Sequence, residues 1–205
     1  MTGRDAMAAG EPLIVVISGP SGAGKSTVAA QVLEKSPELV RSVSLTTREP
    51  RTGDVDGEDY DFVSPEEFAA RREAGILLEW AEVHGNLYGT EAEQVDRSIA
   101  GGKSVLLEID VQGGRRVKAA RPRAILIFLL PPSDEILEER LRGRGTDDEE
   151  VILRRLKNAR EELESANDYD YQVVNDDLGR CVGEVLGIMA VESGESGTDD
   201  PAASL

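Results

Sequence analysis

An eight-residue stretch, GPSGAGKS from Gly19 to Ser26, constrains the fold of this chain more than any other feature. It matches the pattern G-x-x-x-x-G-K-[ST] and lies between an apolar run, LIVVIS at 13–18, and a helical pattern at about 25–35. Small residues let the backbone wrap closely, so its N–H groups can converge on phosphate oxygens at a helix N-terminus. The alternative is a glycine-rich turn, but the strand before it and the helix after it favour a site for ATP or GTP.

Two polar positions in and beyond this loop suit a metal ion. Lys25 supplies positive charge toward the β- and γ-phosphates, and the Ser26 hydroxyl suits Mg²⁺. In SVLLEID, Glu108 and Asp110 share one side of an extended chain, because side chains alternate with period two. Asp110 is then placed to support Mg²⁺ directly or through water, its alternative being a turn residue. We predict Mg²⁺ as cofactor at Ser26 and Asp110. The loop residues expected to bind ATP are Gly19, Pro20, Ser21, Gly22, Ala23, Gly24, Lys25, Ser26 and Thr27.

The apolar runs predict an α/β fold. Four of them read as buried strands of a parallel sheet, at 13–18, 104–109, 124–130 and 171–174. Helical patterns follow them around 25–35, 112–120, 134–142 and 178–190. This alternation is typical of a parallel sheet flanked by helices and joined by right-handed crossovers, as in P-loop nucleotide-binding proteins.

Two segments interrupt the alternation. Residues 44–92 contain short strand-like pieces, DYDFV and LLEW, and a helix for which Ser64 and Glu67 form a capping box. Residues 134–167 are helical and highly charged, with a second capping box from Thr146 to Glu149. We expect an inserted mixed-strand lobe at 44–92, a helical lid at 134–167, and a core at 12–43, 93–133 and 168–191. The small, polar and acidic ends, 1–11 and 192–205, are expected to be disordered.

Composition limits the partners. The 23 Lys and Arg against 40 Asp and Glu give a net charge of -17, which repels nucleic acids and anionic membranes. The single cysteine, Cys181, permits no internal disulfide and is expected to be buried and inert. No apolar run has the length of a signal peptide core or a membrane span, so we expect a cytoplasmic protein. The sequence leaves open whether it is a monomer or a homo-oligomer.

The segment Ser42 to Val63, SVSLTTREPRTGDVDGEDYDFV, concentrates cations in this acidic chain. Arg48 and Arg51 can bind a phosphate through forked, charge-assisted hydrogen bonds, and Tyr60 can add a hydroxyl. Taken alone, two loop arginines more often form a solvated surface. The phosphate loop elsewhere in the chain favours a second anion pocket instead.

Together with the phosphate loop, this segment and five others resemble guanylate kinase. The others are LLEWAEVHGNLYGT, LLEIDVQG, PPS, RLRGRGT and VVNDD, in the order of the family and over about residues 13 to 190. The resemblance implies ATP-dependent conversion of GMP, and of dGMP, to the diphosphate, with a GMP-binding lobe and a lid. Leu87 departs from it, since the family often has a tyrosine there, which weakens any stacking role at that position.

The resemblance also implies the site residues. The GMP site would comprise the phosphate-holding Arg48, Arg51, Tyr60 and Tyr88 and the guanine-pocket residues Ser44, Glu79, Thr90 and Glu108. Arg51, Arg144 and Arg155 would act with Lys25 in catalysis, and Arg140 and Asn175 would contact ATP. Arg142 and Arg154 are expected to be ordinary surface residues of a helix, and the only histidine, His84, has no catalytic role.

The chemistry of guanine supports the pocket independently. Its adjacent N1–H and N2–H donors can both be accepted by one carboxylate such as Glu79, whereas adenine would leave that carboxylate unpaired. Hydroxyls at Ser44 and Thr90 can donate to O6.

Two rival functions remain at this point. A non-catalytic guanylate-kinase-like module that binds peptides would be expected to have lost the phosphate loop or the arginines, yet both are present here. Another P-loop kinase with a different small acceptor is argued against by Glu79, Ser44 and Thr90.

Overall fold

The computed structural model describes residues 10–83, 85–143 and 149–194. Its core is a five-stranded parallel sheet in the order β2-β7-β1-β8-β9. In that order the strands are Leu39–Arg41, Ser104–Glu108, Ile14–Ser18, Ile125–Leu130 and Tyr171–Val174. The carboxyl end of β1 leads directly into the phosphate loop and helix α1 (Lys25–Lys35). Because all five strands are parallel, their carboxyl ends meet at one edge, where ligands bind in such sheets.

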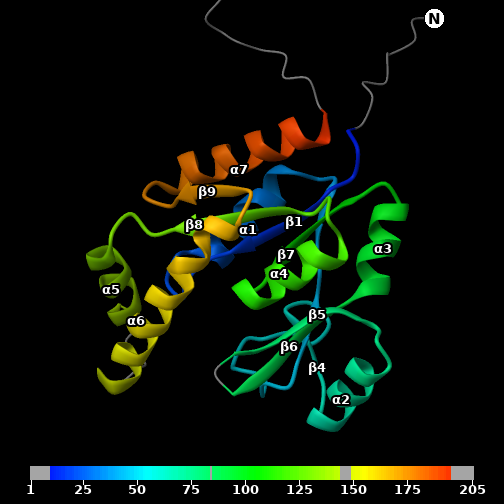
Figure 1. Cartoon of the computed structure of the whole chain (residues 1–205), viewed down its shortest axis with the longest axis horizontal. Helices are drawn as coiled ribbons and strands as arrows, with labels where there is room; N and C mark the ends of the chain where they lie inside the picture. Colours follow the sequence, from blue (N-terminus) through cyan, green and yellow to red (C-terminus); the bar gives the residue numbers. More distant parts are fainter. Residues whose placement is uncertain (1–9, 84, 144–148, 195–205) are drawn as a thin grey trace, which may run out of the picture.

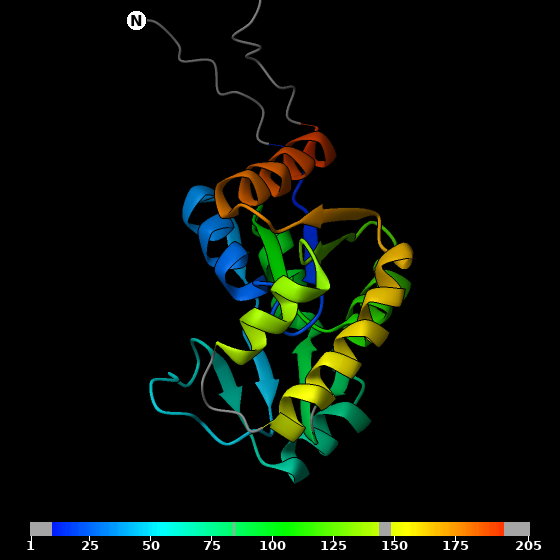
Figure 2. The same ribbon diagram turned by 90° about the vertical axis from the view of Figure 1, so that its left-hand side faces the viewer.

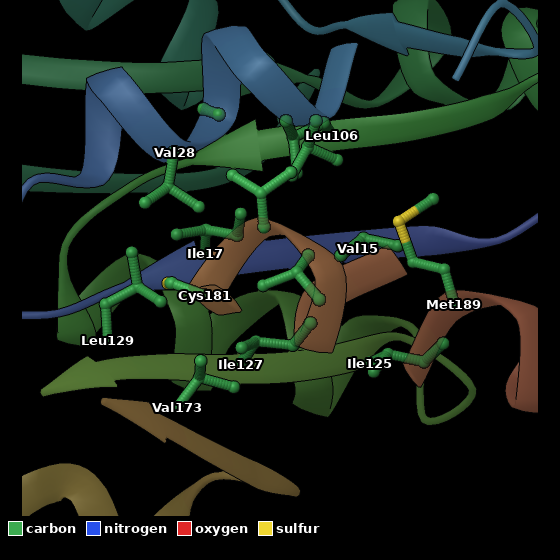
Figure 3. Packing of buried hydrophobic residues seen from close by; sticks show 14 of the residues in the cluster. Val15, Ile17, Val28, Leu106, Ile125, Ile127, Leu129, Val173, Cys181 and Met189 are labelled. Atoms are coloured by element: carbon green, nitrogen blue, oxygen red, sulfur yellow. The ribbon is translucent and has the colours of Figure 1, made fainter. Parts of the chain in front are cut away.

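Helices cover both faces of this sheet (Figure 1). The alternating side chains of β1 divide between the two sides: Val15 and Ile17 face α1 and α7 (Leu178–Ser193), and Val16 faces α3 (Ala92–Ala100) and α4 (Val111–Ala120). Figure 3 shows the first of these layers, in which Val15, Ile17 and Ile127 pack with Cys181. Cys181 is buried as expected, and burial raises the pKa of its thiol to about 11.

The inserted segment forms a second, mixed sheet of four strands in the order β4-β3-β6-β5. These are Tyr60–Phe62, Ser44–Thr46, Asn86–Glu91 and Leu77–Val83, with α2 (Pro65–Glu73) between β4 and β5 in the chain. Ser64 caps α2 by accepting a hydrogen bond from the Glu67 N–H, as predicted. The Glu67 carboxylate, however, accepts from Arg71 on the same helix rather than completing the capping box.

Two helices and a short 3-10 turn follow β8: α5 (Asp134–Arg142), α6 (Glu149–Leu163) and η1 (Glu164–Asp168). Leu137 and Leu141 of α5 pack on Ile152, Leu156 and Ala159 of α6 in a small apolar cluster of their own. In both ribbon views α5 and α6 run from the core sheet to the level of the second sheet (Figures 1 and 2). Arg142 pairs with Glu138 one turn away and with Glu149, as expected of a surface residue.

The α/β fold with its parallel sheet and second mixed sheet confirms the predicted fold class. The four predicted strands of the core sheet and the four helices predicted to follow them are present, but β2, the fifth strand of the sheet, and helix α3 were not predicted. The boundaries drawn for lobe and lid remain our proposal. Disorder was expected for 1–11 and 192–205, but α7 continues to Ser193 and the Glu11 N–H donates to the Ser193 carbonyl oxygen at 3.0 Å, so the expectation was wrong for the described residues of both ends. Residues 1–9 and 195–205, together with His84, Arg144 and Thr146, lie outside the described residues. Among the described residues, no helix is both long and apolar enough to span a membrane.

Candidate active site

Gly19 and Gly24 are the two positions of the phosphate loop where a side chain would have the least room. Gly19 has φ 148°, and a Cβ there would lie 2.4 Å from the Leu129 carbonyl oxygen. Gly24 has φ 91°, and a Cβ there would lie 2.4 Å from the side-chain nitrogen of Asn175. Only glycine tolerates both the backbone conformation and the close approach. Lys25 donates to the carbonyl oxygens of Gly19 (2.6 Å) and Pro20 (3.2 Å), so its ammonium is held against the loop.

Two of the residues predicted to contact ATP lie behind the loop. The Asn175 side-chain amide donates to the Ala23 carbonyl oxygen at 2.7 Å, and Asn175 is buried. Arg140 donates to the Asn175 carbonyl oxygen at 3.0 Å. Asn175 therefore supports the backbone of the phosphate loop, and the contact with ATP expected of it stays a prediction.

The second sheet brings together residues that are far apart in the sequence. In its register, Ser44 of β3 lies beside Tyr60 of β4, and Glu79 of β5 lies opposite Thr90 of β6. The rings of Tyr60 and Tyr88 meet edge to face, with centroids 5.8 Å apart. Paired residues on neighbouring strands share one face of a sheet. One face of this sheet therefore carries most of the predicted GMP-binding residues.

Glu79 is the most unusual of these residues, because its carboxylate is buried and its side chain lines a cleft. Thr90 donates to Glu79 Oε1 at 2.7 Å. Burial raises the pKa of Glu79 to about 7, and the Thr90 hydrogen bond opposes that rise. Because a hydroxyl has only one proton, Thr90 cannot donate to Glu79 and to a guanine O6 at the same time; here it orients Glu79, and the O6 contact expected of it stays a prediction.

Arg48 and Arg51 differ in their surroundings. Arg48 forms an ion pair with Asp54 at 2.9 Å, and its guanidinium lies 5.2 Å from the centre of the Tyr60 ring and 5.5 Å from that of Phe62. Arg51 is exposed and lines the cleft. Arg48 therefore orders the pocket wall, while Arg51 presents its side chain to the cleft.

The predicted metal residues lie at the carboxyl end of β7 and at the start of α1. The Ser26 hydroxyl donates to Glu108, and Asp110 Oδ1 accepts from the Gly113 N–H at 2.8 Å as the N-cap of α4. Burial raises the pKa of Asp110, opposed by its hydrogen bonds from the Gly113 and Gln112 N–H groups. The described residues contain no cluster of three or more His, Cys, Asp or Glu side chains that could hold a metal alone.

One cleft of about 310 Å³ joins these groups, a volume within the usual range of small-molecule sites. The predicted site residues that line it are Gly19, Ser21, Gly22, Gly24, Lys25, Ser26, Thr27, Ser44, Arg51, Tyr60, Glu79, Tyr88, Glu108, Asp110 and Arg155. Pro20, Ala23, Arg48, Thr90, Arg140 and Asn175 are not among its lining residues. Arg144 lies outside the described residues.

The cleft also contains Glu162 of α6, which the sequence did not single out. Burial raises the pKa of this carboxyl, and the nearby charge of Lys25 and the Ser21 N–H oppose the rise. Glu162 stands in a run of charged helical residues, and no local pattern distinguishes it from Glu161 beside it.

Known proteins resemble this chain over most of its length. The guanylate kinase family model matches residues 11–192. The guanylate kinase of Rhodococcus jostii (strain RHA1) is 51% identical over 178 residues, 86% of this chain and 86% of that protein. That of Synechocystis sp. (strain ATCC 27184 / PCC 6803 / Kazusa) is 50% identical over 87% of this chain and 94% of its own length. The crystal structure of guanylate kinase from Anaplasma phagocytophilum superposes with a TM-score of 0.76 at 35% identity, covering 93% of this chain and 91% of that one.

Proposed function

The chain belongs to the guanylate kinase family and transfers a phosphoryl group from ATP to GMP, and from this premise we propose which of its residues hold each substrate. We infer that GMP lies on the second sheet and ATP on the phosphate loop, with the transferred group between them. The support is that one cleft is lined by both sets of residues. The 2′-deoxynucleotide dGMP would occupy the same place, because neither Glu79 nor the phosphate arginines depend on the 2′-hydroxyl for the contacts described below.

The buried Glu79 carboxylate carries the proposal for the acceptor. It would accept from N1–H and N2–H of guanine, and the Thr90 hydrogen bond holds it in orientation. Ser44 and Glu108 also line the cleft, and we propose that they complete the base pocket. An adenine base would leave a desolvated carboxylate without donors, which is the strong form of discrimination available to a polar site.

Phosphoryl transfer needs alignment and neutralisation of charge, with little covalent work for the protein. The GMP phosphate would be held by Arg51, Tyr60 and Tyr88, with Arg48 fixing Tyr60 from behind. Lys25 and the loop N–H groups would hold the ATP phosphates. Arg155, which lines the cleft from α6, would add positive charge at the transferred group. We propose the same task for Arg144, on the family resemblance alone.

Mg²⁺ fits the polar groups at the base of the loop. Ser26 and Asp110 offer a hydroxyl and a carboxylate beside the phosphate site, and Mg²⁺ commonly takes few protein ligands and completes its shell with phosphate oxygens and water. Bound there, it would neutralise charge on the ATP phosphates. Turnover would then stop in excess EDTA and return with added Mg²⁺; undiminished turnover in EDTA would contradict this assignment.

A peptide-binding module without activity is not favoured. Such a module has no use for a lysine held inside a phosphate loop or for a buried carboxylate facing a cleft, both of which are present here.

The raised pKa of Glu79 predicts a pH dependence. Guanine needs the ionised carboxylate. Because the pKa of Glu79 is about 7 in the free protein, the fraction of molecules that carry a protonated Glu79 grows below pH 7, and these must lose that proton before GMP binds. Acid therefore weakens binding: kcat/KM for GMP should fall about tenfold between pH 8 and pH 6. Initial rates at low GMP and saturating ATP measure this.

The control is the Glu79→Gln variant measured over the same range. The second ionisation of a phosphate monoester lies near pH 6 and adds a smaller effect of its own, on the order of twofold. The variant should retain only that part. A flat profile for the unmodified protein, or an identical profile for the variant, would contradict the assignment of Glu79.

A further inference from the structure

Arg116 of α4 lies against Trp80, the residue that follows Glu79 in β5. Its guanidinium carbon is 4.1 Å from the centre of the Trp80 ring, well within the range of a cation–π contact. Arg72 of α2 contacts the same ring, at 5.0 Å. Trp80 is thus held by a cation from the core helix α4 and by another from α2, a helix of the inserted segment.

Arg116 Nη1 is buried and has no hydrogen-bond partner within the described part of the chain. A buried, unpaired donor is costly and needs a compensating interaction. The ring of Trp80 supplies one. A guanidinium in this place also acts through its charge, because burial weakens screening by solvent.

Arg116 lies close enough to the proposed base pocket for its charge to act on Glu79. Glu79 reaches the first turn of α4 so closely that a Cβ on Gly113 would lie 2.6 Å from Glu79 Oε2. Arg116 follows Gly113 by three residues, and residues three apart are neighbours on a helix surface. Burial and the nearby negative charge of Asp110 raise the pKa of Glu79, and the positive charge of Arg116 opposes that rise.

We propose that Arg116 is a positioning residue of the GMP site: it clamps β5 to α4 through Trp80 and provides the positive charge that steadies the buried Glu79 carboxylate. Arg116 is not among the residues that line the cleft, so it acts through Glu79 and does not touch the substrate. This inference rests on the proposed role of Glu79 as the reader of guanine.

The test replaces Arg116 in two ways. Arg116→Met keeps an apolar stem on Trp80 and removes the charge, and Arg116→Lys keeps the charge and loses the planar stack. We expect Arg116→Met to raise KM for GMP on the order of tenfold, within the usual coupling of neighbouring groups, and to leave KM for ATP and kcat within about twofold. Arg116→Lys should restore most of the affinity. A merely structural role would instead lower the unfolding midpoint and change both KM values together.

Arg72→Met is the matched control. Arg72 is exposed and contacts the same Trp80 ring, so this substitution also removes a cation from that ring. It should leave both KM values unchanged. An equal rise in KM for GMP in Arg72→Met would overturn the proposal, since packing on Trp80 would then explain the effect. So would a folded Arg116→Met and a folded Arg116→Lys that both bind GMP normally.

A double-substitution cycle with Glu79→Gln tests the role of Arg116 separately from the role of Glu79 in reading guanine. If Arg116 acts through Glu79, adding Arg116→Met to Glu79→Gln should raise KM for GMP by less than twofold more. Full additivity of the two effects would overturn the inference about Arg116 and leave Glu79 in place. A Glu79→Gln variant with unchanged selectivity for GMP would instead remove the proposed function on which the inference rests.

Discussion

Replacing Lys25 with methionine is expected to lower kcat by on the order of 10³-fold or more, while the protein remains folded. The Lys25 ammonium is held inside the phosphate loop by the carbonyl oxygens of Gly19 and Pro20, so its charge is already in place before ATP arrives. Methionine has a similar length and no charge. The variant would lose the stabilisation of negative charge on the transferring phosphate, which a solvent molecule cannot replace in the same geometry.

The measurement is ADP release at saturating ATP and GMP, with circular dichroism to verify folding. Lys35→Met provides the control, because Lys35 lies at the end of the same helix, α1, and is exposed. It should be as active as the unmodified protein. Turnover by Lys25→Met within tenfold of normal would show that the loop does not work as described here.

Replacing Glu79 with glutamine is expected to lower kcat/KM for GMP on the order of a hundredfold to a thousandfold. An amide offers guanine one carbonyl oxygen and turns an N–H₂ group toward a base that itself presents donors. Thr90, which donates to Glu79 Oε1, would lose its charged acceptor as well. Activity with AMP should change little, so the preference for GMP over AMP should largely disappear.

Glu82→Gln is the matched control, because Glu82 lies on the same strand, β5, and is exposed. Its selectivity should equal that of the unmodified protein. If Glu79→Gln retains full selectivity for GMP, a different group reads the base.

The sequence allowed the core to be predicted because its elements are long and regular. The phosphate-loop motif predicts the end of one strand and the start of the helix that follows. Strands β1, β7 and β8 are mostly apolar. Strands β2, β3 and β4 have three residues each, too few for a periodic pattern to establish them, although the strand-like piece DYDFV anticipated β4. Their existence follows from pairing with distant strands, which a single sequence does not display.

The sequence indicated which residues belong to the site but not how those residues contact one another. Glu79 and Thr90 were both placed in the guanine pocket. Only the pairing of β5 with β6 brings the two side chains together, so that the Thr90 hydroxyl donates to Glu79. Asn175 lies under the phosphate loop because β9 ends beside β8, a relation between segments far apart in the chain. Arg116 meets Trp80 only through the packing of α4 on β5. Such contacts depend on the finished fold.

The most direct measurement is ADP release by the unmodified protein with each of five acceptors: GMP, dGMP, AMP, CMP and UMP. All five carry the same phosphate, so the arginines and tyrosines proposed to hold that phosphate would not distinguish them. A carboxylate that reads N1–H and N2–H distinguishes them. We expect GMP and dGMP to be phosphorylated, and the other three to react at least about a thousandfold less efficiently. Comparable rates with AMP or the pyrimidine nucleotides would contradict a guanine pocket built around Glu79.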